Sequence, residues 1–192
     1  MDSCEAEVAR STSETEIKLY LRHGPGESDI STGIGFFDHM LAAFFLHGGF
    51  SARLSVKGDL RVDGHHTVED AGIAIGSAIR AILDKRPSPE RFAHAYIPMD
   101  EALAFCAADC GGRAYLRCEI PQPQERVGDY DTCLTPEFFR ALTSGARVTL
   151  HITAEGDNAH HITEAVFKAA GRAVGAAMRE RGGAVPSTKG SL

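Results

Sequence analysis

The sequence predicts an α+β fold made of two similar halves, with helices packed between two mostly antiparallel sheets. The first observation is an internal repeat: HHTVEDAGIAIGSAIRAIL at 65–83 aligns with HHITEAVFKAAGRAVGAAM at 160–178, and both carry apolar residues at helical spacing. The second is that a segment of alternating polar and apolar residues precedes each of these helices, at 51–60 and 147–156, as is typical of strands. Helices and sheets of this kind bury their apolar faces against one another.

The remaining elements complete a β-β-α-β-α order in each half. In the first half, strands are expected at 15–24 and at SDIST (28–32), followed by a short helix within 36–50 that ends in glycine. In the second half, the segment 101–120 is expected to form two strands that turn at Cys110–Gly112, and the matching short helix lies within 134–148.

The two halves are expected to meet through their helices, and neither should be stable alone. The turn-rich stretch KRPSPERF (85–92) marks the join between them. We therefore expect a first half at 1–88, a second half at 89–181, and a Gly/Pro/Ser-rich tail at 182–192 that is not helical.

The composition is that of a soluble globular protein. Of 192 residues, 43% are hydrophobic and 24% are charged, which suffices for a real core. The net charge of −6 and the scattered Lys and Arg residues leave no basic face for a nucleic acid. A small anionic substrate is compatible with these values, because a few cations from distant positions can form a local positive pocket.

The cysteines and the apolar segments indicate the cellular compartment in which the protein is expected. Five cysteines without CxxC spacing argue against a disulfide framework or a zinc ribbon. No apolar run approaches the roughly 20 residues of a membrane span. The N-terminal segment resembles neither a secretory signal nor a transit peptide. We therefore expect a cytoplasmic protein without a nucleic-acid or membrane partner.

Each repeated helix begins with His-His and carries a Glu four residues after the first His. Neighbouring side chains on a helix point about 100° apart, whereas residues four apart share a face. His65 with Glu69, and His160 with Glu164, are therefore expected to form two clamps, while the second histidine of each pair faces another ion. Such an imidazole and carboxylate set suits Mn²⁺, Fe²⁺, Co²⁺ or Zn²⁺ and is too rich in nitrogen for Mg²⁺ or Ca²⁺.

A polar helix start on the surface would explain one such motif, because a Glu in the first turn faces the positive end of the helix dipole. Two motifs at matched positions favour metal binding. His39, in the apolar segment FFDHMLAAFF, would need a partner if buried, and either a metal or a hydrogen bond could supply it. Its repeat-mate Glu137 is also able to bind a metal, but in the segment TPEFF the helix dipole alone would favour a Glu.

Segments in order along nearly the whole chain resemble the imidazoleglycerol-phosphate dehydratase family. They are RSTSET (10–15), TGIGFFDHML (32–41), DGHHTVEDAGIAIG (63–76), MDEAL (99–103), GGRAYL (111–116), RVGDYDT (126–132), NAHHITEAVFKAAGRA (158–173) and PSTKG (186–190). The resemblance implies a duplicated α+β fold, two Mn²⁺ per active site, and a 24-subunit shell built from trimers with active sites at subunit interfaces. The implied activity is dehydration of D-erythro-imidazoleglycerol phosphate to imidazole acetol phosphate in histidine biosynthesis, through an imidazolate stabilised by two metals.

The resemblance also assigns residues by position. The implied metal ligands are His39, His65, His66, Glu69, His160, His161 and Glu164, and Glu137, which stands where the family usually has His, is expected to complete the set. The implied substrate contacts are Arg91, Arg113, Lys168, Ser187, Thr188 and Lys189. Glu14 is the candidate acid or base, and His47 or a metal-bound water competes with it.

Two other functions remain open at this point. A di-metal hydrolase would use a metal-bound hydroxide on a phosphorylated small molecule and would release phosphate. A non-enzymatic, ferritin-like metal-storage shell would be almost entirely helical and would rely mainly on Glu and ExxH motifs.

Overall fold

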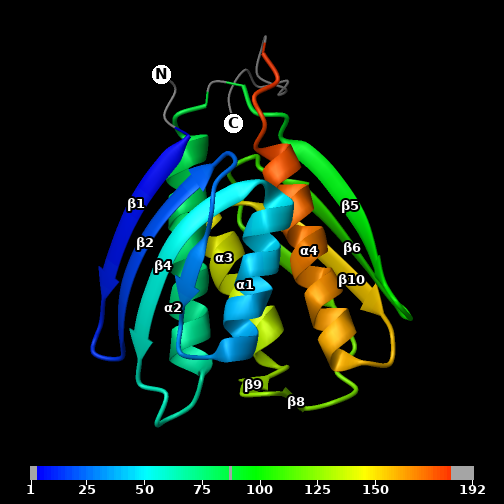
Figure 1. Ribbon diagram of the computed structural model, residues 1–192. Coiled ribbons are helices and arrows are strands. Elements are labelled where there is room, and N and C mark those ends of the chain that lie inside the picture. Colours follow the sequence, from blue (N-terminus) through cyan, green and yellow to red (C-terminus); the bar gives the residue numbers. More distant parts are fainter. Residues whose placement is uncertain (1–3, 87, 183–192) are drawn as a thin grey trace.

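The computed structural model describes residues 4–86 and 88–182, in which a layer of helices lies between two four-stranded sheets (Figure 1). The first sheet has the order β1 (Glu5–Ser11), β2 (Thr15–His23), β4 (Phe50–Gly58), β3 (Asp29–Ser31). The second has the order β5 (Phe92–Met99), β6 (Ala102–Asp109), β10 (Thr149–Glu155), β7 (Tyr115–Glu119). The helices are α1 (Gly35–Gly48), α2 (His65–Leu83), α3 (Leu134–Ala146) and α4 (Ala159–Ala177).

The two halves share one topology. In each sheet three strands pair antiparallel and the short last strand runs parallel to its neighbour, β3 beside β4 and β7 beside β10. Alternating burial along β2 and β6 turns one face of each sheet toward the helices. The predicted α+β class, with helices between two mostly antiparallel sheets, is confirmed.

The order within each half differs from the prediction by one strand, since each half runs β-β-β-α-β-α. Strands β1 and β5 were not predicted, and both lie at sheet edges. Most residues of β5 are exposed or half-buried, with Ala95 as the fully buried one, so the strand lacks a strong apolar alternation. The two strands expected within 101–120 are present as β6 and β7, with the predicted turn between them, but β7 pairs with β10 and not with β6.

Caps and turns fix where the helices begin and end. α1 ends at Gly49 in the left-handed conformation (φ 70°), as predicted, whereas α3 ends at Arg147, which adopts a similar φ of 55° without being glycine. At the start of α4, the Asn158 side chain accepts hydrogen bonds from the N–H groups of both histidines of its motif. Asp129, in the hairpin of β8 (Arg126–Val127) and β9 (Tyr130–Asp131), accepts from the first N–H groups of α1.

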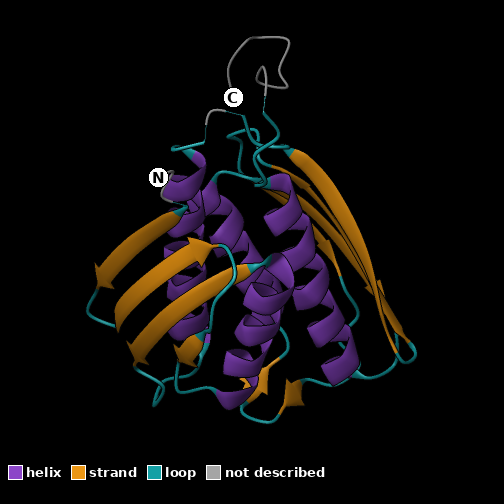
Figure 2. Ribbon diagram, turned by 45° about the horizontal axis from the view of Figure 1, so that its top comes forward, coloured by secondary structure: helices purple, strands orange, loops and turns teal. Residues whose placement is uncertain are grey.

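The helices pair across the two halves, α1 with α4 and α2 with α3, and the helix layer lies between the two sheets (Figure 2). Both pairs rest on a close approach at glycine. A Cβ at Gly171 would lie 2.3 Å from the carbonyl oxygen of Phe44, and a Cβ at its repeat-mate Gly76 would lie 2.4 Å from that of Leu142. A stack of buried phenylalanines, including Phe138, fills the rest of the helix layer. Within the described residues, no helix is long and apolar enough to cross a membrane.

Candidate metal and substrate site

The two His-His motifs lie at the same end of the helix layer. The helices α2 and α4 both begin at this end, beside the β8–β9 hairpin and the start of α1 (Figure 1). His65 is the first residue of α2, and His160 is the second residue of α4. The repeat detected in the sequence is therefore also a repeat in space.

Helices α1 and α4 bring three metal-ligating side chains together. Glu164 Oε2 lies 3.4 Å from His39 Nε2 and 3.2 Å from His160 Nε2. One ligand atom from each residue lies within 4.8 Å of the others, and among the described residues this is the one such group of three or more. We refer to His39, His160 and Glu164 as the His39 cluster. His39 is about half-exposed and not buried, and its Nε2 faces the Glu164 carboxylate.

Glu164 carries the negative charge of the His39 cluster. The carboxylate is buried, and burial alone would raise its pKa. Lys168 Nζ lies 2.7 Å from Glu164 Oε1, and this hydrogen bond, with the nearby histidines, holds the pKa of Glu164 below its ordinary value. The site therefore presents an ionised carboxylate beside two imidazoles, which is a donor set that divalent transition metals accept.

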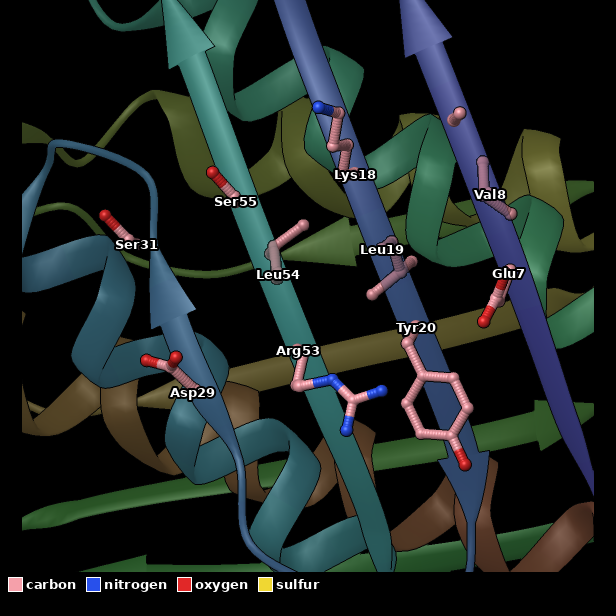
Figure 3. Close-up of a pocket in the computed structure, with 11 residues that line it drawn as sticks. Glu7, Val8, Lys18, Leu19, Tyr20, Asp29, Ser31, Arg53, Leu54 and Ser55 are labelled. Carbon is pink, nitrogen blue, oxygen red and sulfur yellow. The ribbon is translucent and has the colours of Figure 1, made fainter.

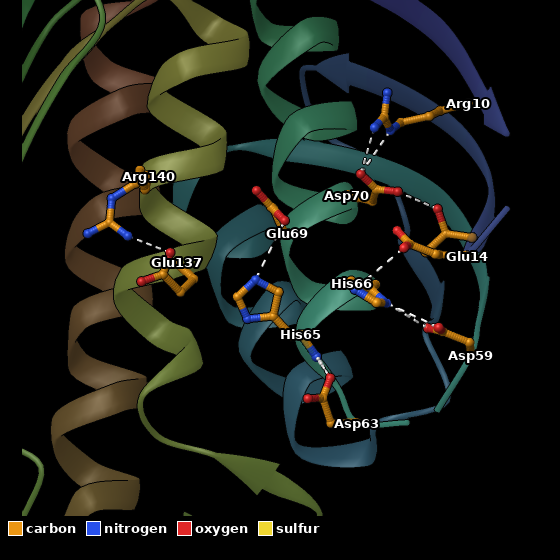
Figure 4. A network of polar contacts seen from close by, with 11 residues as sticks. Arg10, Glu14, Asp59, Asp63, His65, His66, Glu69, Asp70, Glu137 and Arg140 are labelled. Atoms are coloured by element: carbon orange, nitrogen blue, oxygen red, sulfur yellow. Dashed lines mark hydrogen bonds and ion pairs between the residues drawn. The ribbon is translucent and has the colours of Figure 1, made fainter. Parts of the chain in front are cut away.

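The other predicted clamp lies on α2. His65 Nε2 lies 3.6 Å from Glu69 Oε2, one helical turn along the same face (Figure 4). Glu137 projects from α3, the helix that packs against α2, and forms an ion pair with Arg140. The first residue of α3 is Leu134, so Glu137 lies in the first turn, where the helix dipole favours it without a metal. The Thr135 hydroxyl does not cap the helix and bonds to Tyr130 instead.

The second histidine of each motif points away from the first and is held by a carboxylate. His66 Nδ1 lies 3.1 Å from Asp59 Oδ2, and His161 Nδ1 lies 2.8 Å from Glu101 Oε2. These hydrogen bonds raise the pKa of both histidines, and the bond from His161 lowers the pKa of Glu101 to about 2. A carboxylate at Nδ1 fixes the ring and leaves Nε2 to face outward, which is the usual support of a metal-binding histidine.

Glu14 lies beside the first of these outward nitrogens. Its carboxylate Oε1 is 3.7 Å from His66 Nε2, and its side chain is half-exposed (Figure 4). Glu101 is the repeat-mate of Glu14, because each residue directly precedes the second strand of its half. Sequence reasoning gave no role to Asp59 or Glu101. Extending the repeat alignment from the helices to RSTSET and MDEAL would have found Glu101, whereas nothing in the sequence singled out Asp59.

Positive charge gathers next to the His39 cluster on α4, where Lys168 and Arg172 follow Glu164. Partial burial, together with the charges of Lys168 and Arg172, lowers the pKa of His47. Lys168 lies near His47 and also forms an ion pair with Glu164. The candidate acid or base His47 and the candidate substrate contact Lys168 therefore lie near each other, and Arg172, which was not predicted, lies near them.

Two predicted arginines lie elsewhere. The Arg91 backbone N–H bonds to the carbonyl oxygen of Ala177 at the far end of α4, 17 residues beyond His160, or roughly 25 Å along the helix axis. Its guanidinium Nε lies 2.8 Å from Asp109 Oδ1. Arg113 lies between β6 and β7. Within a single subunit, these two arginines therefore lie away from the His39 cluster. The predicted contacts Ser187, Thr188 and Lys189 lie outside the described residues.

A hollow of the surface lies apart from these residues. It lies on the face of the first sheet that is turned away from the helices, and charged side chains such as Glu7, Lys18 and Arg53 project into it (Figure 3). None of the candidate site residues lines this hollow. The candidate chemistry therefore lies on the helix ends and not in this concavity.

Comparison with known proteins places the chain among dehydratases. The family model described as imidazoleglycerol-phosphate dehydratase matches residues 32–174. The imidazoleglycerol-phosphate dehydratase of Gluconobacter oxydans is 50% identical and covers 100% of this chain and 99% of its own. That of Gluconacetobacter diazotrophicus is 52% identical, with 97% of both chains covered.

Solved structures give the same result for the fold. The dehydratase of Staphylococcus aureus superposes with a TM-score of 0.84 at 38% identity, covering 92% of this chain and 99% of that one. The enzyme of Pyrococcus furiosus superposes with a TM-score of 0.85 at 36% identity, covering 96% and 100%. Together with the paired His-His motifs and the His39 cluster, these matches over the full length show that the chain belongs to the imidazoleglycerol-phosphate dehydratase family.

Proposed function

We propose that this protein removes water from D-erythro-imidazoleglycerol phosphate to give imidazole acetol phosphate, a step of histidine biosynthesis. The observation that carries the proposal is the His39 cluster in a member of this family. Its ligand groups suit a metal that binds the imidazole ring of the substrate, and the flanking Lys168 suits the negatively charged phosphate. The mixed α+β architecture disfavours a ferritin-like storage shell, which consists almost entirely of helices.

We propose two divalent ions, Mn²⁺ in both positions, as the cofactors. The donor set fits them: His39, His160 and Glu164 would hold one ion, and His65 and Glu69 would hold the other, with Glu137 completing the set. The outward Nε2 atoms of His66 and His161 would add one imidazole each, since Asp59 and Glu101 already occupy their Nδ1 atoms. When bound, such ions supply Lewis acidity to the two ring nitrogens of the substrate.

The proposed reaction breaks two bonds of the substrate, and residues of this chain are placed to move the proton and to bind the phosphate. The C–O bond on the carbon next to the ring breaks, a C–H bond on the following carbon breaks, and the leaving hydroxyl and proton form water. The resulting enol tautomerises to the ketone. Glu14, exposed and beside His66, is our candidate to move the proton, and His47 is the competing candidate. Lys168 and Arg172 provide positive charge for the phosphate group of the substrate.

A complete site would require more than one subunit. The half-exposure of His65 and Glu69 and the distance of Arg91 from the His39 cluster support a site that a neighbouring subunit completes. We propose trimers assembled into a 24-subunit shell, with Arg91, Arg113 and the tail residues 187–189 contacting substrate bound to a neighbour's metals. We also propose that the protein works in the cytoplasm, where its five free cysteines would stay reduced.

The test is turnover with the named substrate. Protein reconstituted with Mn²⁺ is incubated with imidazoleglycerol phosphate, and the ketone product is followed by the absorbance of its enolised form at high pH, alongside a free-phosphate assay. The proposal expects ketone without phosphate release. Phosphate release would identify a hydrolase instead, and no product of either kind would contradict an enzymatic role on this substrate.

A further inference from the structure

A buried carboxylate on α2 lies next to the candidate site and has no part in the chemistry described so far. Asp70 is 6% exposed and follows the candidate ligand Glu69 directly in the chain. Its Oδ1 accepts from Arg10 on β1, at 3.0 Å from Nε and 2.8 Å from Nη2, and its Oδ2 accepts from the hydroxyl of Thr15 on β2 at 2.5 Å (Figure 4). Asp70 therefore ties the metal-binding helix to the first two strands.

The strand end that Asp70 holds is the one that carries Glu14. Thr12 Oγ1 accepts from the N–H groups of Glu14 at 3.2 Å and Thr15 at 3.0 Å. The backbone carbonyl of Glu14 accepts from the N–H of Asp59 at 3.1 Å, and Asp59 in turn holds His66. The backbone of Glu14 is thus held at both its N–H and its carbonyl, and its carboxylate faces His66.

The second half of the chain shows that the fold does not need this polar network. Both halves have the same strand register, so each residue of the network has a structural equivalent. The equivalents are apolar: Ile97 for Arg10, Ala102 for Thr15 and Ala165 for Asp70. In the second half, the helix therefore packs against its sheet with apolar side chains at these positions. A buried charge with its partners is seldom more stabilising than an apolar replacement.

We propose that Asp70, Arg10 and Thr15 are positioning residues for Glu14: they hold the 11–15 turn against α2 so that the Glu14 carboxylate stays at its place beside His66. The inference rests on the proposed function of Glu14 as the group that moves a proton. A shift of the carboxylate by about 1 Å costs on the order of 100-fold in rate, so the clamp acts on kcat more than on substrate binding.

The test uses Thr15, where the hydroxyl can be removed without changing the size of the side chain. In Mn²⁺-loaded protein, Thr15→Val is expected to lower kcat about 10- to 100-fold, with KM for imidazoleglycerol phosphate and the metal content unchanged. Thr15→Ser keeps the hydroxyl and should restore most of the turnover. Thr143→Val is the matched control, because that buried hydroxyl bonds to a carbonyl oxygen within α3 and should not affect kcat.

A double variant shows whether the network acts through Glu14. If it does, Glu14→Gln with Thr15→Val is no slower than Glu14→Gln alone. Wild-type kcat in Thr15→Val, or losses that multiply in the double variant, would overturn the inference while leaving the proposed function intact. Wild-type kcat in Glu14→Gln would instead remove Glu14 from the proposed function, and with it the group that the clamp is said to position.

A second variant separates positioning from folding. The triple change Arg10→Ile, Thr15→Ala, Asp70→Ala copies the second half into the first, and we expect it to fold, bind metal and show reduced kcat. Failure of this variant to fold would show that the network is structural and would overturn the proposal.

Discussion

A methyl group added at Gly171 is expected to separate α1 from α4 and to weaken the His39 cluster. The Cβ of Gly171→Ala would lie 2.3 Å from the Phe44 carbonyl oxygen, whereas ordinary contacts begin near 3.4 Å. The obstacle is backbone, so the helices have to move apart by roughly 1 Å. Overpacking of this kind costs about 3 kcal/mol at the upper end of its usual range, and the better helix propensity of alanine returns about 1 kcal/mol. The net loss is about 2 kcal/mol.

Two measurements follow from that displacement. Thermal unfolding of the metal-free protein by circular dichroism should show a Tm about 4–8 °C lower, from the usual scaling for a chain of this size. Calorimetric titration with Mn²⁺ should show weaker binding at the His39 cluster, because His39 lies on α1 and its partners lie on α4, with only 3.4 Å between His39 Nε2 and Glu164 Oε2.

The duplicated half supplies the matched comparison. Gly76→Ala at the equivalent position on α2 should cost similar stability, since its Cβ would lie 2.4 Å from the Leu142 carbonyl oxygen. It should leave the His65–Glu69 pair intact, because both residues lie on α2. Ala42→Gly on the exposed side of α1 measures the propensity contribution alone. The reasoning is refuted if Gly171→Ala unfolds at the wild-type Tm, or if Gly171→Ala binds Mn²⁺ as tightly as the wild type.

Three further predictions concern His23, Glu137 and the C-terminal tail. Burial, with the charges of nearby arginines, lowers the pKa of His23 from 6.5 to about 4, so folding favours the neutral ring; its contribution to stability is complete above pH 6.5 and is lost as the pH falls toward 4. The free energy of unfolding of His23→Gln, measured with denaturant, should therefore fall less between pH 6.5 and 4 than that of the wild type. An equal fall in both proteins would contradict this. Glu137→Ala should lose roughly one ion per chain and Glu137→His should restore it with activity; two ions and normal turnover in Glu137→Ala would make the residue only a helix-start acid paired with Arg140. Truncation before Ser187 should raise KM sharply and leave the ion content unchanged, and normal kinetics would show that the tail is idle.

Much of the fold followed from periodicity and from the repeat. The HH helices, the strands that precede them and the short helices that follow a strand pair could be predicted because their apolar residues recur at helical or strand spacing. The edge strands β1 and β5 could not, because their side chains are mostly exposed and carry a weak pattern. The order of strands in the second sheet depends on long-range pairing that neighbouring residues do not encode.

The two helical His–Glu pairs of the candidate site could be predicted from the sequence, but the grouping of side chains from different elements could not. The spacing of four residues placed His65 beside Glu69 and His160 beside Glu164 from the sequence alone. The contact between His39 and Glu164 could not be predicted from spacing, because it depends on the packing of α1 against α4. The supporting carboxylates Asp59 and Glu101 lie outside the helical motifs and meet the histidines only through the fold.

The most direct test of the two-metal account is the number of ions that active protein contains. Elemental analysis of protein that dehydrates imidazoleglycerol phosphate should find two divalent ions per chain. Chelation should remove both the ions and the activity, and added Mn²⁺ should restore them. One ion or none per chain in fully active protein, or turnover that survives complete chelation, would contradict the account.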